Sequence, residues 1–343
     1  MTNTKRDATS PETITLGRLL AHEFPPREAL VAPWLRQGES AMIWAAPGVG
    51  KTLLTLTLAV MVAGGGEVMG WKSEQPRKVL FIDGEMAIED LQERAKMLIE
   101  TVEGIDREAA SRNLHILSRN WQSPDAAFPD LNDAESRAGK ASGQDEVLRE
   151  ARRLGAELVI LDNFATLATS VADENDAAAM TPTVAFLLRM KQAKIAAILV
   201  HHSGKTGETY RGSSKLATTF EVILGLKAEA GTVGLGAAFT LVWTKYRGKP
   251  DASVRPRTVR LVKDDAGKER WQVEASVDDE MQALIEAVES CRYATQKDVA
   301  QALSWDTSKV TRTKVRAIKA GFITEDHWDR CLREGRGEDQ LGF

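Results

Sequence analysis

The feature that most constrains the fold is residues 45–52, which read Ala-Ala-Pro-Gly-Val-Gly-Lys-Thr. A short apolar run precedes them at 41–44 and a long one follows at 53–63. This order predicts a strand, a glycine-rich turn and a helix, which is the context of a phosphate-binding loop. The motif usually opens with glycine, whereas this chain has Ala45. The pattern predicts a nucleoside triphosphate site, and the alternative is a chance turn before a buried helix.

The residue types of this loop have separate predicted roles. Lys51 is expected to reach the β- and γ-phosphates, and the Thr52 hydroxyl to hold Mg²⁺. Backbone N–H groups that point into one concavity, together with the positive end of the following helix, favour anion binding. The residues predicted to cradle the phosphates are Pro47, Gly48, Val49, Gly50, Lys51, Thr52 and Leu53.

The composition fits a soluble globular protein of 343 residues, with 43% hydrophobic and 27% charged residues. The net charge of −4 gives no overall reason to bind nucleic acid, so such binding would need local basic patches. The two cysteines, Cys291 and Cys331, match no metal-ligand spacing, and we expect a reducing, cytoplasmic setting. The polar N-terminus has no signal-peptide pattern and the apolar run at 53–66 is too short to span a membrane, so no membrane partner is expected.

Apolar runs typical of buried strands alternate with helical patterns between residues 41 and 200. This alternation predicts an α/β fold whose mostly parallel sheet is covered by helices on both faces. Residues 1–30 are predicted as a partly disordered lead-in with a short helix near 16–23, and residues 31–276 as the α/β domain. The predicted strands are 41–45, 78–83, 158–162, 195–200, 220–226, 239–245 and an edge strand at 270–273, and the predicted helices are 53–63, 88–103, 144–154 and 183–194.

Residues 277–343 predict a separate small domain. Helical patterns at 281–290, 296–303 and 307–320 precede a short apolar run, Phe322–Thr324, that predicts a strand. Three short helices and a hairpin-like tail are typical of a winged helix-turn-helix.

The third of these helices carries basic side chains and no acidic one. A basic helix in this position is expected to enter the major groove of duplex DNA, where each neutralised phosphate adds affinity. The alternative is a protein-contact domain whose charges are merely solvated. The candidate DNA contacts are Lys309, Arg312, Lys314, Arg316 and Lys319.

Two further apolar runs end in carboxylates. Glu85 lies just past the run at 79–82, and Asp162 ends the run at 158–161. Ligands of open α/β sheets bind at the carboxyl ends of the strands, where the phosphate loop also lies. Asp162 therefore suits the role of the Mg²⁺ carboxylate and Glu85 that of the base for the attacking water. The alternative for Glu85 is capping of the following helix.

A histidine pair follows the apolar run at 198–200. One polar residue there would lie beside the γ-phosphate and report its presence to the next loop, and the alternative is one buried and one surface histidine. Residues 210–215 are basic and contain no acid. Lys205, Arg211 and Lys215 are therefore candidate contacts to the phosphates of nucleotide or nucleic acid.

Taken in order, the phosphate loop, Ile-Asp-Gly-Glu at 82–85, Asp162, His-His-Ser-Gly-Lys at 201–205 and Arg-Gly-Ser-Ser at 211–214 resemble RecA-fold, AAA-type ATPases. The likeness is greatest to plasmid RepA-type hexameric replicative helicases, with DnaB-type helicases more distant. It implies ATP and Mg²⁺ as cofactors, a homo-oligomeric ring, usually of six subunits, and single-stranded DNA in the central channel. It also implies that His202 senses the γ-phosphate.

RepA-like proteins place an arginine shortly after Arg-Gly-Ser-Ser that reaches into the neighbour's site, and the stretch 219–222 has none. DnaB-like helicases use a Lys-x-Arg at the end of a late strand instead, which Lys245-Tyr246-Arg247 matches. The resemblance thus assigns Arg247, with Lys245, as the finger that acts on a neighbouring subunit. A solvated basic turn is the alternative.

Three functions fit these residues. The first is an ATP-driven, ring-forming DNA helicase or translocase of a mobile element or phage, with single strands in the ring and duplex at the winged helix. The second is a DNA-bound ATPase switch or loader that assembles on duplex DNA without unwinding it. The third is a small-molecule kinase, which is disfavoured because nothing resembles an acceptor pocket.

Overall fold

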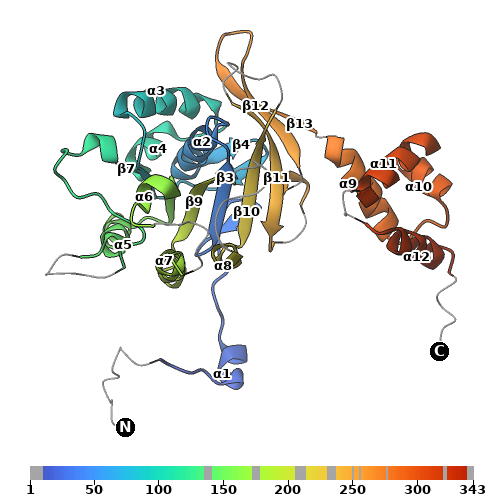
Figure 1. Cartoon of the computed structure of the whole chain (residues 1–343), viewed down its shortest axis with the longest axis horizontal. Coiled ribbons are helices and arrows are strands. Elements are labelled where there is room, and N and C mark those ends of the chain that lie inside the picture. Colours follow the sequence, from blue (N-terminus) through green and yellow to red (C-terminus); the bar gives the residue numbers. More distant parts are fainter. Residues whose placement is uncertain are drawn as a thin grey trace.

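The computed structural model describes most of the chain as a large α/β body, a short helix near the N-terminus and a group of helices at the C-terminal end (Figure 1). The described residues are 11–134, 141–171, 178–204, 214–229, 237–248, 251–254, 256–275, 277–319 and 323–337. None of the helices formed by these residues is long and apolar enough to cross a membrane.

The body is built on one large sheet. Within the described residues, nine strands pair in the order β13-β12-β11-β10-β3-β9-β8-β6-β7. Neighbours from β10 to β7 are parallel, and β11, β12 and β13 extend the sheet antiparallel. The strands are β3 (Ser40–Ala45), β6 (Val79–Asp83), β7 (Leu114–Ser118), β8 (Leu158–Asp162), β9 (Ala196–His202), β10 (Val222–Ala228), β11 (Ala238–Tyr246), β12 (Arg257–Lys263) and β13 (Glu269–Ala275).

Helices cover both faces of the parallel part. Successive strand residues point to opposite faces, and in β3 Ile43 packs into one hydrophobic cluster while Met42 and Trp44 pack into the other. Because both faces are buried, the strands are apolar almost throughout. The helices on the first face are α2 (Lys51–Gly64), α3 (Ile88–Leu98) and α4 (Arg107–Asn113), and those on the second are α5 (Gly143–Leu154), α6 (Phe164–Leu167), α7 (Thr181–Gln192) and α8 (Ser214–Thr219).

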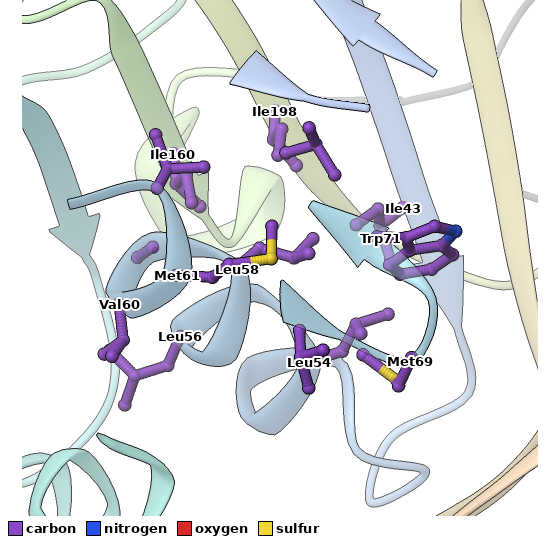
Figure 2. Close-up of a cluster of buried hydrophobic side chains, with 14 of the residues drawn as sticks. Ile43, Leu54, Leu56, Leu58, Val60, Met61, Met69, Trp71, Ile160 and Ile198 are labelled. Atoms are coloured by element: carbon purple, nitrogen blue, oxygen red, sulfur yellow. The ribbon is translucent and has the colours of Figure 1, made fainter. Parts of the chain in front are cut away.

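Helix α2 is buried almost all round, as a helix without a polar face must be. Twelve of its 14 residues are buried, and Lys51 is its only charged residue. Figure 2 shows its side chains among Ile43, Ile160 and Ile198 of the sheet and beside Trp71. Each buried leucine of this helix contributes about 1.5–3 kcal/mol. The packing fixes the start of α2 at the edge of the sheet.

Short elements complete the body. The first helix, α1 (Leu16–Ala21), precedes a two-stranded ribbon of β1 (Ala29–Val31) and β2 (Leu35–Arg36). A second ribbon joins β4 (Gly66–Val68) to β5 (Trp71–Ser73). Single 3₁₀ turns lie at Ile99–Thr101, Arg119–Trp121 and Ala252–Val254.

The α/β class and the mostly parallel sheet predicted from the sequence are confirmed. The predicted helix at 88–103 is wrong at its end, because α3 stops at Leu98 and continues as a 3₁₀ turn. Strand β7 was not expected, since it is short, contains His115 and Ser118, and follows α4 with no turn residue between them. Strand β12 was also missed, because arginine, threonine and lysine interrupt its apolar pattern.

The C-terminal helices share a hydrophobic cluster of their own, which includes Leu284, Val299, Val310 and Trp328. Its helices are α9 (Val277–Glu289), α10 (Gln296–Ala302), α11 (Thr307–Lys319) and α12 (Glu325–Gly335). Thr295 caps α10 through a reciprocal capping box with Asp298.

The predicted hairpin-like tail is wrong, and of the predicted strand at 322–324 Phe322 lies outside the described residues. Ile323 and Thr324 lie outside any strand, and α12 follows, capped by Thr324, whose hydroxyl accepts the N–H of His327 at 3.2 Å. The tail forms a helix because Trp328 and Cys331, three residues apart, fall on one buried face. Strands are absent from 277–319 and 323–337, so the described part of this unit is helical without a wing.

We expect that a chain ending at residue 276 folds and still binds nucleotide, because the C-terminal helices have a separate core. Circular dichroism and binding of a fluorescent ATP analogue measure both properties. The control is the full chain with Trp328→Ala, which disrupts the C-terminal core alone. Loss of cooperative unfolding in the truncated chain would show that the helices are part of the body.

Candidate active site

The parallel strands bring the predicted site residues to one edge of the sheet. Asp83 at the end of β6 is in register with Asp162 at the end of β8, and Ala45 at the end of β3 with His202 at the end of β9. They surround a cavity of about 620 Å³. Its lining residues are Pro47, Gly48, Gly50, Lys51, Thr52, Leu53, Asp83, Glu85, Met86, Ala87, Asp90, Arg94, Asp162, Asn163 and His202.

The glycine-rich turn has the backbone that its sequence predicts. Gly48 and Gly50 have φ of 78° and 116°, where side chains are disfavoured. A Cβ on Gly50 would also lie 2.8 Å from the Cβ of Ala237. Of the seven predicted loop residues, only Val49 does not line the cavity, since its side chain packs into the core.

Lys51 lies folded over this loop. Its Nζ donates to the carbonyl oxygens of Ala45 and Ala46 at 3.1 and 3.0 Å, and the residue is buried. Burial lowers the pKa of the Lys51 ammonium, while Asp162 and Glu85 act in the opposite direction. A buried ammonium whose ligands are neutral carbonyls suits exchange of these partners for phosphate oxygens.

Asp162 lies against the start of α2. Its Oδ2 accepts the hydroxyl of Thr55 at 3.2 Å, and Thr52 also bonds to this carboxylate. Burial raises the pKa of Asp162 to about 6, and the nearby Asp83 adds to the rise. The hydroxyl and carboxylate are hard oxygen ligands that suit Mg²⁺. Among the described residues no three acidic, histidine or cysteine side chains gather to hold a metal.

Glu85 is held by a side chain from the neighbouring strand end. Asn163 Nδ2 donates to Glu85 Oε2 at 2.7 Å, and Asn163 Oδ1 accepts the N–H of Thr166 at 3.3 Å, which caps α6. Both ends of the amide are therefore in use and its orientation is fixed. In the described part of the chain, Glu85 makes no hydrogen bond to the start of α3, whose N-cap is Ala87. The N–H of Ile88 is accepted by Asn120 Oδ1 at 3.4 Å instead.

The two histidines differ in position, since one is buried in the core and the other lines the cavity and not the open surface. His201 is buried with its ring 5.0 Å from that of Phe164. His202 is half-buried at the cavity. This placement suits a contact from His202 to a bound phosphate.

The sequence analysis assigned no role to six of the lining residues, and Asn163, Asp83 and Arg94 are three of them. Asn163 follows Asp162 directly, so its place after a strand end could have identified it. Burial raises the pKa of Asp83 to about 6, with Met86 N–H donating to its carboxylate at 3.0 Å. Arg94 lies within α3, and only the fold shows that this helix borders the cavity.

Lys245 and Arg247 do not line the cavity of their own chain. Lys245 Nζ donates to the carbonyl oxygens of Ala217 and Thr218 at 2.8 and 3.3 Å. Both carbonyls belong to the last turn of α8. Arg247 is exposed just past β11. Lys245 thus caps a helix, whereas Arg247 remains available for an intermolecular contact.

The predicted DNA contacts are placed only in part. Lys205 and Arg211 lie outside the described residues, as do the side chains of Lys215 and Lys319. Within α11, Lys309 pairs with Glu280 at 2.6 Å and Lys314 with Glu325 at 3.2 Å. Both ammonium groups also lie over tryptophan rings, of Trp305 and Trp328. Arg312 and Arg316 are exposed.

We expect Lys51→Ala to abolish ATP hydrolysis and weaken nucleotide binding, because Lys51 neutralises charge on the transferred phosphoryl group. Glu85→Gln should keep binding and lose turnover, since the cradle stays intact. Steady-state phosphate release and fluorescent nucleotide titration separate the two effects. Normal hydrolysis by Glu85→Gln would remove the base assignment.

We also expect Asp83 and Asp162 to reduce the free energy of unfolding of the nucleotide-free chain as pH rises from 4 to about 6, with no further loss from these two groups at higher pH. The raised pKa values of Asp83 and Asp162 mean that the folded chain binds these protons more tightly than the unfolded chain. Asp83→Asn should therefore raise the free energy of unfolding at pH 7.5 by on the order of 1–3 kcal/mol and leave it nearly unchanged at pH 4. Urea unfolding at both pH values measures this.

The matched control is Asp90→Asn, which removes an exposed carboxylate from the same cavity. Asp90→Asn should change the free energy of unfolding little at either pH. An equal effect of Asp83→Asn at both pH values would contradict a role for its charge.

Comparison with known proteins agrees with this site. The sequence matches the AAA domain family AAA_25 over residues 6–208, which is more than half of the chain and contains the phosphate loop, both carboxylates and His202. No curated protein matches the chain.

Two solved structures resemble it at low identity. A KaiC-like protein of the hyperthermophilic archaeon Pyrococcus horikoshii OT3 is 13% identical with a TM-score of 0.46, over 72% of this chain and 99% of that one. The flagellar accessory protein FlaH of Methanocaldococcus jannaschii is 14% identical with a TM-score of 0.45. The match covers 70% of this chain and 91% of FlaH. With its phosphate loop at the edge of a largely parallel sheet, this chain belongs to the AAA domain family, as a P-loop protein with a RecA-like core.

Proposed function

We propose that this protein is an ATP-hydrolysing, ring-forming DNA helicase or translocase of RepA-like type, which acts in replication of a mobile element or phage. The observation that carries its ATPase part is the cavity at the sheet edge, where Lys51, Thr52, Asp162 and Glu85 meet. Loop, metal ligands and base come from three separate strand ends, which is the arrangement that phosphoryl transfer needs.

In this proposal, Lys51 leaves its carbonyl partners and binds the β- and γ-phosphates. Bound Mg²⁺, held by Thr52 and Asp162, would offset the phosphate charge. Glu85 takes the proton of a water that attacks the γ-phosphorus, and Asn163 keeps its carboxylate in place through the 2.7 Å bond. His202, at the end of β9, contacts the γ-phosphate and changes position when it leaves.

The homo-oligomer is proposed from the resemblance to ring-forming ATPases and from the positions of the basic side chains relative to the cavity. Arg94 and Lys51 are the cationic side chains that the described residues place around it. Arg247 lies exposed outside it, which supports a role at the site of a neighbouring subunit. A ring of six with single-stranded DNA in its channel is taken from the resemblance to RepA-type helicases.

Duplex DNA is proposed as the ligand of the C-terminal unit. Arg312 and Arg316, four residues apart on α11, are exposed on one face of that helix. Lys309 and Lys314 are paired with carboxylates, so the two arginines carry most of the expected phosphate contact.

A second candidate is a DNA-bound ATPase switch or loader. It is favoured by the separate core of the C-terminal unit, which could hold duplex DNA while the body cycles between nucleotide states. In that case ATP occupancy would change assembly on DNA without strand separation.

Strand displacement on a forked duplex distinguishes the two. A helicase separates the strands with ATP and shows ATPase stimulation by single strands, and Glu85→Gln is the matched inactive control. ATPase stimulation by duplex without displacement would favour the switch. The absence of ATPase activity with and without either DNA would contradict both.

We predict that Arg247→Ala binds ATP normally and hydrolyses it far more slowly, since trans-acting arginines contribute on the order of 10³–10⁵ in rate. Mixing with Lys51→Ala subunits should restore activity, because their Arg247 serves the competent neighbouring site. The rescue is measured as ATPase activity at a series of mixing ratios of the two variants. Failure of rescue in mixed assemblies that are shown to form would rule out the trans role.

A further inference from the structure

The chain carries an exposed apolar segment at its N-terminal end. Every residue from 11 to 28, called here the N-terminal arm, is exposed, and no residue of α1 is buried. Among the described residues, half of the exposed large hydrophobic side chains lie in this arm: Ile14, Leu16, Leu19, Leu20 and Phe24. Leu20 is the most exposed of these five side chains, at 77%. Such a concentration on one segment indicates a binding element.

The secondary structure of the arm points the same way. Helix α1 has six residues, and isolated helices of that length are unstable in water. Its start is fixed by Thr15, whose hydroxyl accepts the N–H of Arg18 at 3.3 Å. A capped short helix without a buried side chain becomes stable when its apolar residues pack against another surface.

A complementary surface lies at the far edge of the sheet. An apolar groove of about 370 Å³ runs between α3 and the edge strand β7, and we call it the α3–β7 groove. Trp121 and Ile116 are 74% and 41% exposed there. The groove is lined by Ile88, Leu91, Gln92, Ala95, Ile116, Ser118 and Trp121.

Charge also matches between the two surfaces. Arg18 is the one charged residue of α1 and is exposed. Along α3, Glu89 and Glu93 are exposed, one helical turn apart and next in sequence to the groove residues Ile88 and Gln92. Lys96, next to the groove residue Ala95, is also exposed on α3. A helix that docks its leucines in the groove is therefore expected to place Arg18 beside Glu89 and Glu93 and away from Lys96.

We propose, building on the ring-forming function above, that the N-terminal arm of one chain docks in the α3–β7 groove of a second copy. Figure 1 shows α1 well away from α3 in its own chain, at the other end of the body. A contact between two different surfaces of identical chains is heterologous, and successive contacts of this kind generate a ring when the rotation closes. The arm thus supplies the contact that holds neighbouring ATP sites together.

The first test is the solution mass of the full chain, with and without an ATP analogue, by light scattering. Leu16→Asp with Leu20→Asp in the arm, and Trp121→Asp in the groove, should each weaken self-association about tenfold or more. These side chains are exposed, so the variants should still fold and bind fluorescent nucleotide. Val315→Asp, an exposed apolar position on α11, is the control and should assemble as the unaltered chain does.

The second test identifies the partner. Chains with Leu20→Cys and chains with Trp121→Cys, each in a Cys291→Ser background and carrying different tags, are mixed and oxidised. Disulfides that join unlike chains are expected. A third chain carries both Leu20→Cys and Trp121→Cys in the same background. If that chain cross-links at monomer mass and the mixed single-cysteine chains do not cross-link, the arm closes on its own groove and the proposal is overturned.

The remaining outcomes separate this inference from the proposed function. If the unaltered chain assembles and the arm and groove variants assemble equally well, the arm contact is wrong while a ring remains possible. If the unaltered chain stays monomeric with nucleotide and DNA, both the arm contact and the ring are wrong. Restored assembly when Arg18→Glu chains are combined with Glu89→Lys and Glu93→Lys would support the docking orientation.

Discussion

A buried hydrogen bond from Thr55 to Asp162 joins the helix that follows the phosphate loop to the end of strand β8. The rest of the site depends on this junction. Because α2 is packed on nearly all sides, Lys51 and Thr52 in its first turn cannot shift without disturbing the core. Strand β9 pairs in parallel with β3 and with β8, and β6 pairs in parallel with β8. The ends of these strands therefore lie together, and Glu85 and His202 reach the same cavity. The backbone at the start of α2 is therefore held by the core beneath it.

The buried charged groups of this site suit binding of a ligand and do not stabilise the empty fold. Two carboxyl groups with raised pKa values lie beside a lysine with a lowered pKa, and desolvation is the largest cause in each case. Mg²⁺ and a nucleoside triphosphate would supply the missing counter-charges, which explains why such groups persist in a buried position. Asn163 is the one neutral side chain that links the carboxylate region to a helix cap, and it fixes Glu85 without adding charge.

Several features of the chain remain incomplete within a single copy. Arg247 is exposed away from the cavity, and the N-terminal arm carries apolar side chains that no part of the described chain covers. The α3–β7 groove leaves Trp121 exposed at the other edge of the body. These features share one physical reason: each offers chemistry that a monomer does not use. If the proposed assembly forms, these features would connect the nucleotide site to the DNA function proposed for the C-terminal helices.

The sequence by itself determined the phosphate loop, the carboxylates after two strands and the alternation of buried strands and helices, because glycine spacing and apolar runs are local properties. It could not determine the tail, where a buried face of Trp328 and Cys331 made a helix of a predicted hairpin. Nor could it show that Asn163 bonds Glu85, 78 residues away, or that Lys245 caps α8 instead of remaining free. Those contacts depend on which strands and helices become neighbours, and only tertiary packing decides that.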